Sequence, residues 1–578
     1  MFDVVIKNGT VIDGTGKARF QADLGVEGNR ITAVEDIGKA EAKTTLDATD
    51  KIVCPGFVDP HSHAELAMFR EDHHTLLEPL IRQGITTFVG GNCGMSLAPL
   101  QEKNLAAIGT YINIFSRIDI ERDLPWRTSG EFFNTLETRG LAMNMAPLAP
   151  HGLLRMNETG RQMRYATEDE IENMARALEQ CLEEGAIGLS TGLQYVPGSQ
   201  SDSRELHRLG QVLKKYDGIF TSHLRSYSNT LPQAMDEVIE VADKSGIRAQ
   251  ISHIFWVPDM GWIGPLARGA VRVMAKLSKW WTPPIPLHKP IQERIEQMLD
   301  AQKRGVNVSM DIMPTTSGFT HIFAFFPPWS VEGTSEEVLA RLQDPDMRKK
   351  IRHGIEHGKT EWPHVEGDSW SLNLFKIMGW ECAHIMAVGS EKNKKYEGRQ
   401  LVEIAAEQGK HPFDAACDLI LEENGHVLVF ESMAEPDDHF TERSMFAGLK
   451  HPDVMISTDA ILMGEGHPSK LFYGCYPIFL GRFVRDMKLI NLEQAIRKCT
   501  SLPAEHFRLK GRGKIEKNAY ADIVVFDPNT LHSNACFTKP NQFPQGIEHV
   551  FINGNHVVNQ GTYCPNPRPG RILKRNTS

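Results

Sequence analysis

The stretch that decides the fold is "PGFVDPHSHAE", residues 55–65. A short apolar run ends at Asp59-Pro60 and is followed by two histidines, His61 and His63, one residue apart. Side chains along a strand alternate between its two faces, so these two imidazoles point the same way. Two neutral imidazoles that converge at a strand end provide half of a metal site. Taken alone, the pair fits two solvated loop histidines equally well, and the rest of the chain has to decide.

The composition is that of an ordinary globular protein, with 578 residues of which 41% are apolar and 24% are charged. The net charge of −10 and the lack of a basic run in the sequence argue against a nucleic-acid partner. No apolar stretch approaches the length of a membrane span, so no membrane partner is expected. The first residues lack the pattern of an export signal, and the nine cysteines form no CxxC pair. We therefore expect a cytoplasmic protein.

Both ends of the chain show patterns of short strands, and the long middle part differs from them. In the opening "MFDVVIKNGTVIDG", apolar and polar residues alternate, and Asn8-Gly9 predicts a hairpin turn. In the middle, helical patterns alternate with short apolar runs, which is typical of βα units and a parallel sheet. One helix can be bounded, because Thr167 and Glu170 form a capping box at its start and Gly185 ends it.

Eight candidate strands lie in this middle part, and eight βα units predict an α/β fold, a (β/α)8 TIM-like barrel. The strands are "IVCPGFVDPHSH", "TTFVGGNCG", "LAMNMAPLAPHG", "AIGLSTGL", "GIFTSHLRS", "RAQISHIFW", "NVSMDIMPTT" and "DVMISTDA". We expect the terminal strands to form a small β-sandwich from both chain ends. The predicted bounds are 1–54 and 511–578 for the two parts of the sandwich and its tail, and 55–510 for the barrel. Insertions at the barrel mouth are expected near 254–290 and 315–450.

Residues able to bind a metal stand at the ends of several predicted strands. Cys93 follows the second strand, His223 and His253 end the fifth and sixth, and Asp459 follows the eighth. Each of these alone is more often a structural residue. In a TIM barrel, however, the carboxyl ends of the strands meet at one central mouth. Six residues are therefore candidate ligands, in a donor set that suits zinc: His61, His63, Cys93, His223, His253 and Asp459.

The mixed donor set also indicates the chemistry. Cys93, His223 and His253 supply three zinc ligands and leave a fourth position open, which is the mark of a catalytic site. Zinc would activate water near neutral pH and polarise a carbonyl group. Asp459 would then act as general base on that water and give the proton to the departing nitrogen.

Eight motifs give the chain a family resemblance: "GGNCGMSLAP", "GAIGLSTGLQYVPG", "HPFDAACDLILEENG", "HPDVMISTDA", "YPIFLGRFVR", "AIRKCTSLPAEHFRLKGRG", "AYADIVVFDP" and "GIEHVFINGNHVV". With them, and with the HxH after "PGFVD", the chain resembles the amidohydrolase superfamily. More closely, it resembles the N-acyl-D-amino-acid deacylases, the D-aminoacylase family. The resemblance runs from about residue 1 to 560. The cysteine after strand 2 is its most specific feature, because it replaces the carboxylated lysine of many relatives.

The resemblance implies a set of roles. One Zn²⁺ would be held tightly by Cys93 and the histidines of strands 5 and 6, and a second, often weaker metal by the histidine pair after strand 1. Asp459 would be the catalytic carboxylate, and Tyr195 would contact the scissile amide.

Two positions depart from the family pattern. The family usually carries a lysine two residues after the strand-6 histidine and a tyrosine two residues after the strand-7 aspartate, and both hold the free carboxylate of the substrate. Here these positions are Phe255 and Met313. A carboxylate against such an apolar wall would lose its water without gaining a partner. We therefore expect a substrate without a free carboxylate at that point, or with one placed elsewhere, against Arg225.

Further residues allow a functional and a structural interpretation. Four tryptophans of segment 254–290 would form an apolar rim for a bulky substrate, or would pack on their own helix or on a subunit neighbour: Trp256, Trp262, Trp280 and Trp281. Three phenylalanines would extend this rim: Phe323, Phe325 and Phe326. Arg225 and His151 also stand at strand ends, where they would bind a substrate oxygen or form loop salt bridges.

The leading functional hypothesis is zinc-dependent hydrolysis of a linear amide C–N bond in a small molecule with a bulky apolar part. One alternative is opening of a cyclic amide or imide, as in hydantoinase-like or dihydroorotase-like relatives, although these resemble the lysine version of strand 2. Another is a metal-free assembly protein on the same fold. Self-association into a homo-oligomer is compatible with the sequence.

Overall fold

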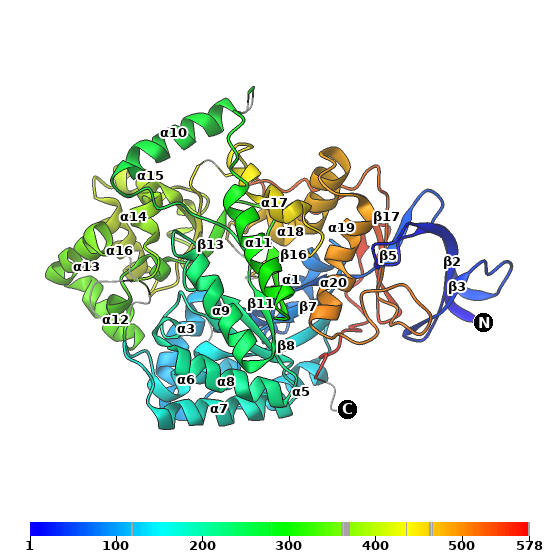
Figure 1. Cartoon of the computed structure of the whole chain (residues 1–578), viewed down its shortest axis with the longest axis horizontal. Helices are drawn as coiled ribbons and strands as arrows, with labels where there is room; N and C mark the ends of the chain where they lie inside the picture. The colour runs from blue at the N-terminus through cyan, green and yellow to red at the C-terminus, as the bar shows by residue number, and fades with distance from the viewer. Residues whose placement is uncertain are drawn as a thin grey trace.

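The computed structural model describes residues 1–116, 120–278, 280–281, 283–359, 362, 370–434, 436–461, 464 and 466–575. At its centre, eight parallel strands pair in the order β16-β12-β11-β10-β9-β8-β7-β6 (Figure 1). They are β6 (Phe57–Asp59), β7 (Ile85–Gly90), β8 (Asn144–Pro150), β9 (Gly188–Gly192), β10 (Ile219–His223), β11 (Arg248–Ile251), β12 (Val308–Ile312) and β16 (Val454–Ile456). Each of the eight predicted strands supplies one of them, and the predicted (β/α)8 barrel is confirmed.

The barrel closes just beyond the ends of its first and last strands. The backbone N–H of Asp459 donates to the carbonyl of His61 at 2.9 Å, and that of His63 donates to the carbonyl of Ala460 at 2.9 Å. Three of these four residues are candidate metal ligands. The hydrogen bonds that close the ring therefore also bring the two ends of the site together.

Helices cover the outside of the barrel and follow its strands in turn. The helices up to β12 are α1 (His73–Leu76), α2 (Glu78–Ile81), α3 (Leu105–Ser116), α4 (Ile120–Asp123), α5 (Ser129–Arg139), α6 (His151–Thr159), α7 (Glu168–Glu183), α8 (Ser203–Lys215), α9 (Leu231–Ser245), α10 (Gly264–Leu277) and α11 (Lys289–Lys303). The later ones are α17 (Phe446–Lys450), α18 (Lys470–Pro477), α19 (Leu492–Cys499) and α20 (Ser501–His506). The predicted capping box of Thr167 and Glu170 is present at the start of α7.

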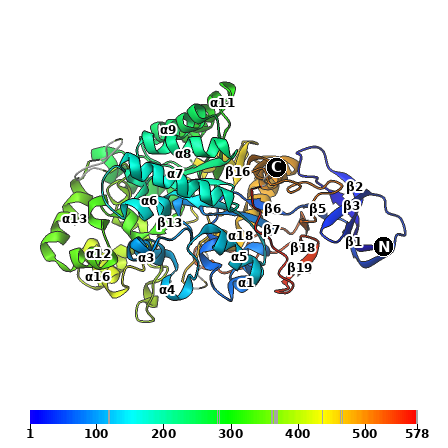
Figure 2. The same cartoon turned by 90° about the horizontal axis from the view of Figure 1, so that it is seen from below.

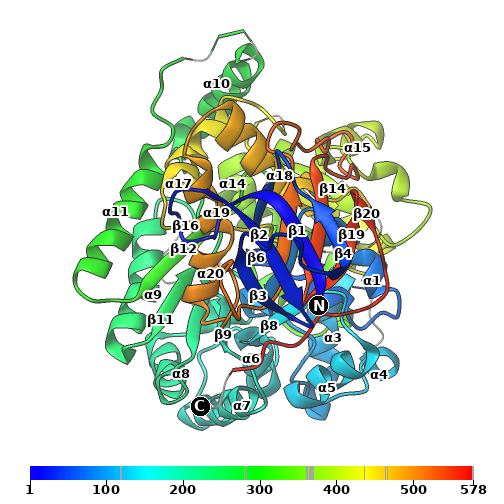
Figure 3. The same ribbon diagram turned by 90° about the vertical axis from the view of Figure 1, so that its right-hand side faces the viewer.

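The two chain ends form a separate nine-stranded sheet with its own apolar core. Its strands are β1 (Phe2–Val11), β2 (Phe20–Glu27), β3 (Arg30–Glu35), β4 (Ala42–Asp47), β5 (Ile52–Pro55), β17 (Ile523–Phe526), β18 (Ile547–Ile552), β19 (Asn555–Asn559) and β20 (Thr562–Tyr563). Strands from both termini lie together in Figure 3, where β1 to β4 face the viewer. The first predicted strand is divided, because β5 pairs with β1 and β17 and only β6 joins the barrel. On this arrangement we propose the bounds 1–54, 55–510 and 511–578.

The hairpin predicted at Asn8-Gly9 is wrong. Strand β1 continues through both residues, and its register with β2 shifts between Ile6 and Gly9. Asn8 does adopt the left-handed φ of 61° that a turn would need, and its N–H donates to Asp23 at 2.9 Å. The Asn8-Gly9 dipeptide therefore marks a β-bulge within β1 and not a hairpin turn.

A large insertion between β12 and β16 lies at the opposite end of the molecule from the terminal sheet (Figure 2). It contains a three-stranded antiparallel sheet in the order β13-β15-β14. Its elements are β13 (Gly318–His321), β14 (Ala383–Ala387), β15 (Leu428–Glu431), α12 (Ser335–Gln343), α13 (Pro345–His357), α14 (Leu374–Met378), α15 (Leu401–Glu407) and α16 (Pro412–Glu422). Within the part of the chain that is described, none of the helices has the length and apolar character needed to cross a membrane.

Candidate metal centre and substrate pocket

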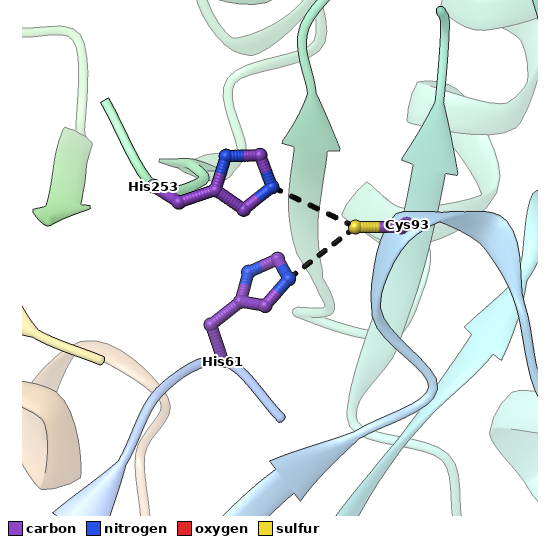
Figure 4. A group of neighbouring side chains, drawn as sticks. All are labelled: His61, Cys93 and His253. Atoms are coloured by element: carbon purple, nitrogen blue, oxygen red, sulfur yellow. Dashed lines mark hydrogen bonds between the residues drawn. The ribbon is translucent and has the colours of Figure 1, made fainter. Parts of the chain in front are cut away.

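All six candidate ligands meet at the carboxyl ends of the barrel strands. His61 and His63 follow β6, Cys93 follows β7, His223 ends β10, His253 follows β11 and Asp459 follows β16. All six are buried. Figure 4 shows the imidazoles of His61 and His253 directed at the sulfur of Cys93 from two different loops. The sequence placed these residues at strand ends, and the fold brings them to one point.

Three of the ligands surround a first metal position. The Sγ of Cys93 lies 3.6 Å from Nδ1 of His223 and 3.8 Å from Nε2 of His253. The two ring nitrogens are 3.0 Å apart. Tetrahedral zinc, with bonds of about 2.3 Å to sulfur and about 2.0 Å to nitrogen, separates such ligands by roughly 3.3–3.6 Å. The three side chains therefore fit one zinc ion and leave its fourth position free.

A second position adjoins the first. Oδ1 of Asp459 lies 3.3 Å from Nε2 of both His61 and His63. Nε2 of His61 is also 3.3 Å from the sulfur of Cys93. His61 and Cys93 thus stand between the two positions, and the site has the donors for two adjacent metals.

The backbone at three ligands is held in an unusual conformation. Cys93, His253 and Asp459 have φ values of 53°, 33° and 53°, in the left-handed region that residues other than glycine seldom adopt. Asp311 supports one of them, since its Oδ1 accepts from the N–H of His253 at 2.8 Å and from Ser457 at 2.6 Å. Left-handed residues at strand ends turn these side chains inward, as is common at functional sites.

The protonation states suit metal binding. Burial lowers the pKa of His223 well below its usual value and that of His253 to about 4, so both imidazoles are neutral. Burial raises the pKa of the Cys93 thiol well above its ordinary value, and the Asp459 carboxylate adds to this effect. A thiolate therefore forms here only when a cation lies beside it. Nε2 of His223 also donates to Oε1 of Gln194 at 2.9 Å, which leaves Nδ1 free to face the metal position.

Asp459 remains ionised despite its surroundings. Burial acts to raise the pKa of its carboxyl, but the charge of His61 and the hydrogen bonds from His61 and His63 outweigh it and lower the pKa well below its usual range. The site thus contains an anionic carboxylate next to the open face of the metal positions.

One pocket opens directly on the ligands, and three of the expected substrate contacts line it: Tyr195, Phe255 and Met313. The ring of Tyr195 lies 4.6 Å from that of His223. Its hydroxyl accepts from Thr320 at 3.4 Å. Phe255 is stacked on Tyr227 with 4.2 Å between ring centres, and Tyr227 in turn contacts His223 and His253. Phe255 is therefore fixed against the metal ligands.

A second, mostly apolar pocket continues outward from the first. The two share a boundary of five residues: His253, Phe255, Met313, Gly318 and Glu431. Its outer wall is apolar and includes Trp256, Val271, Leu287, Ile291, Met378, Met433, Phe440 and Met445. We refer to the two as the metal pocket and the apolar pocket. Together they offer space for an amide at the metals and for an apolar group beyond it.

Two expected substrate contacts are directed elsewhere. Arg225 is buried, pairs with Glu237 at 2.8 Å and donates to the carbonyls of Ser199 and Ser201. His151 is buried with Nε2 2.6 Å from Glu205, which also pairs with Arg155. Neither lines the metal pocket or the apolar pocket among the described residues. Both side chains are paired with a buried or partly buried glutamate, as the structural interpretation expects.

The expected aromatic rim is only partly formed. Of the four tryptophans, only Trp256 lines the apolar pocket. Trp262, Trp280 and Trp281 are 91%, 82% and 62% exposed and lie on or beside α10, which projects from the molecule in Figures 1 and 3. The three phenylalanines are buried within the insertion: Phe323, Phe325 and Phe326. Phe325 packs on Phe375 of α14 and Phe326 on Phe413 of α16, and none of the three lines the apolar pocket.

Two residues of the site were missed from the sequence. Gln194 stands beside the predicted Tyr195, and its position in "GLQYVPG" gave a usable signal. Glu431 ends β15, more than a hundred residues after β11 and β12, which precede His253 and Met313. Its local sequence "LVFES" contains no motif, so only the folded chain places it at the pocket.

Comparison with known proteins gives a consistent result. Residues 425–558 match a model of the amidohydrolase family. The chain is 31% identical to N-acyl-D-glutamate deacylase of Alcaligenes xylosoxydans xylosoxydans, over 100% of this chain and 97% of that protein. It is 28% identical to D-aminoacylase of the same organism, over 99% and 98% of the two chains.

Two solved structures resemble the whole chain. One is N-acyl-D-glutamate deacylase from Bordetella bronchiseptica with zinc and a phosphonate inhibitor that mimics the tetrahedral intermediate, with a TM-score of 0.74, 27% identity and 99% of both chains covered. The other is a D-aminoacylase with a binuclear metal centre, described as activated by one metal and attenuated by the second. Its TM-score is 0.73, with 26% identity over 99% of this chain and 100% of that one.

Proposed function

Because this chain belongs to the amidohydrolase family, in its N-acyl-D-amino-acid deacylase (D-aminoacylase) branch, we propose that it hydrolyses a linear amide whose bulky part is apolar. It is a metal-dependent hydrolase of carbon–nitrogen bonds other than peptide bonds, and zinc is its cofactor. Cys93, His223 and His253 would hold one zinc tightly, and His61, His63 and Asp459 a second metal more weakly. The ligand distances support this assignment.

Zinc at this centre supplies Lewis acidity, which activates water and polarises a carbonyl oxygen near neutral pH. Asp459 would take a proton from the attacking water as the new C–O bond forms. It would then pass that proton to the amide nitrogen as the C–N bond breaks, so that a carboxylic acid and an amine leave. Its low pKa in the free protein keeps it ready to accept.

Tyr195 would bind the scissile amide. Its hydroxyl accepts a hydrogen bond from Thr320 and so keeps its own hydrogen free for a carbonyl oxygen. The same residue stands against His223, at the inner end of the metal pocket. This position would orient the carbonyl and support developing negative charge on its oxygen.

The observation that carries the substrate proposal is the lining of the two pockets. Among the described residues, the two pockets contain no lysine and no arginine, and Phe255 and Met313 form the apolar part of the boundary between them. A free carboxylate at this boundary would have no partner, at a cost of several kcal/mol. The alternative placement against Arg225 has no support, because that guanidinium is already paired. The substrate would therefore carry no carboxylate at this point, with its apolar part in the apolar pocket.

The remaining features support more general proposals. All nine cysteines are free thiols, which supports a reducing, cytoplasmic location. The apolar outer face of α10, with Leu266, Val273 and Leu277 exposed, supports self-association into a homo-oligomer. The cyclic-amide alternative is disfavoured by Cys93, and a metal-free assembly role by the presence of all six candidate ligands, buried at the carboxyl ends of the barrel strands.

The proposed function is tested by elemental analysis of the purified protein followed by a hydrolysis screen. We expect about one tightly held zinc per chain and turnover of carboxylate-free aryl or alkyl amides. The screen includes N-acyl amino acids of both hands and cyclic imides. Zinc-loaded protein that cleaves only the cyclic compounds would support the alternative, and protein without zinc would support the assembly role.

A further inference from the structure

Glu431 occupies an unusual place for a carboxylate. It is the last residue of β15 and belongs to the shared boundary of the metal pocket and the apolar pocket. Its side chain is therefore presented to whatever lies between the metals and the outer wall. No other acidic residue among those described lines the apolar pocket.

The carboxylate is buried without a partner. Glu431 is 8% exposed, and its Oε2 is completely buried and accepts no hydrogen bond. Within the described chain it forms no salt bridge, and neither pocket is lined by a lysine or arginine. The nearby hydroxyls of Thr316 and Thr441 are paired with each other. Burial raises the pKa of Glu431 to about 7, as expected for a carboxyl with nothing to stabilise its charge.

The surrounding fold accommodates this side chain. In the inserted sheet Glu431 pairs directly with Gly318 of β13. A Cβ atom at position 318 would collide with the Glu431 carboxylate, so glycine leaves the space that the carboxylate fills. The side chains of the apolar pocket beside Glu431 include Met313 and Met433, and a leucine or methionine at 431 would continue that surface without the cost of burying a carboxyl. An unpaired acid at a pocket boundary indicates that its partner comes from a ligand.

We propose that Glu431 is a substrate-binding residue that accepts a hydrogen bond from a donor near the scissile amide, and that a protonated amine is the donor it favours. This role of Glu431 rests on the proposed function in one respect, namely that the ligand is an amide substrate. A cationic or N–H group at this point would satisfy the buried carboxylate, and the charge-assisted bond would favour it over an apolar isostere. A substrate carboxylate would instead meet a like charge. The site would thus select amides with a basic group close to the cleaved bond and an apolar remainder.

The test uses three amides with one common apolar acyl group, on zinc-loaded wild-type protein. Their amine parts are diaminobutane, pentylamine and aminobutyrate, which are cationic, neutral and anionic at similar length. We expect kcat/KM to fall in that order, with at least about tenfold between the first two. Glu431→Gln should remove the preference for the cationic amide and change the neutral one by less than about threefold. Glu431→Lys should make the anionic amide the best of the three.

The control is Glu381→Gln, which removes another carboxylate of the insertion that is paired with Arg272 outside both pockets. In this control variant, the kcat/KM values for the three amides should keep the wild-type order. Zinc content and circular dichroism verify that each variant is folded and loaded. If Glu431→Gln keeps the cationic preference unchanged, the inference is wrong while amide hydrolysis stands.

Calorimetry separates the inference from the proposed function. Binding of diaminobutane to zinc-loaded wild-type protein should be at least about tenfold tighter than binding to Glu431→Gln. If no amide is cleaved but this difference is found, the proposed function fails and the role of Glu431 stands. Equal affinity of both proteins for the diamine, with or without amide cleavage, overturns the role of Glu431.

Discussion

The pocket has two walls of different origin and different chemistry. The barrel wall, made by the loops after β6, β7, β10, β11 and β16, brings together imidazole, thiolate and carboxylate on a constrained backbone. The insertion wall, made by β13 and β15 with the residues after β12, combines apolar side chains with threonine and serine hydroxyls, and Glu431 is its one acidic residue among those described. The first wall has the groups needed for bond cleavage, and the second has the groups that distinguish one substrate from another. Mutations in the barrel wall should therefore affect bond cleavage, whereas mutations in the insertion wall should affect which substrate is preferred.

The largest effect is expected from the barrel wall at Cys93. Cys93→Ala removes the ligand that lies between both metal positions, so the protein should lose its tight zinc and at least about 10³-fold in kcat/KM. Elemental analysis after dialysis measures the first effect. Cys417→Ala, a buried cysteine in α16 outside the site, should keep both metal and activity. Full zinc content in Cys93→Ala would remove this residue from the ligand set.

Asp459 should matter for turnover more than for folding. Asp459→Asn keeps the size of the side chain and removes the base, so kcat should fall by roughly 10²–10⁴. The tight zinc should remain, because its three proposed ligands lie at the carboxyl ends of β7, β10 and β11. Circular dichroism and zinc content establish that the variant is folded. Near-normal turnover in such a protein would exclude Asp459 from proton transfer.

At the boundary of the two walls, Phe255 after β11 and Met313 after β12 should control substrate preference without affecting the reaction itself. The double change Phe255→Lys with Met313→Tyr supplies polar groups to a substrate carboxylate. The ratio of kcat/KM for an N-acyl-D-amino acid to that for its neutral analogue should rise by about 10- to 100-fold. Zinc content should be unchanged. A ratio that stays where it is in the wild type would show that these side chains do not face the substrate.

The smallest effect is expected from Glu431 on the pH dependence of the stability of the folded protein. The ordinary pKa of a glutamate is 4.5, whereas burial raises that of Glu431 to about 7. Between these values the unfolded chain releases a proton that the folded chain retains, so wild-type stability falls as pH rises from 4.5 to 7. Glu431→Gln removes this contribution. The melting temperature of the wild type should be close to that of Glu431→Gln at pH 5 and a few degrees below it at pH 8. Equal melting temperatures at both pH values would mean that the Glu431 carboxylate is paired in the folded protein.

The barrel wall was predictable because its information is local. Each ligand stands in a short motif directly after an apolar run, and the alternation of strands and helices fixes which strand ends meet. His61 and His63 could be paired from sequence spacing alone. Their partner Asp459 required only the assumption that an eight-stranded barrel closes, which the backbone hydrogen bonds from Asp459 to His61 and from His63 to Ala460 confirm.

The insertion wall was predictable only in part, because its contacts are long-range. The family pattern identified Met313, and Phe255 on the barrel side of the boundary, but nothing in the sequence pairs Gly318 with Glu431 across the inserted sheet. Local signals also had more than one structural outcome. Asn8 took the backbone conformation of a turn inside a bulged strand, and Arg225 found its carboxylate twelve residues later on α9.

The most direct test of the proposed substrate class is a comparison on the unmodified protein. With zinc bound, kcat/KM is measured for an N-acyl-D-amino acid and for its carboxamide, which share the acyl group and the side chain. An apolar boundary with one buried carboxylate predicts that the neutral carboxamide is hydrolysed at least about tenfold better. Tenfold better hydrolysis of the free acid would contradict this and would assign the protein ordinary D-aminoacylase activity.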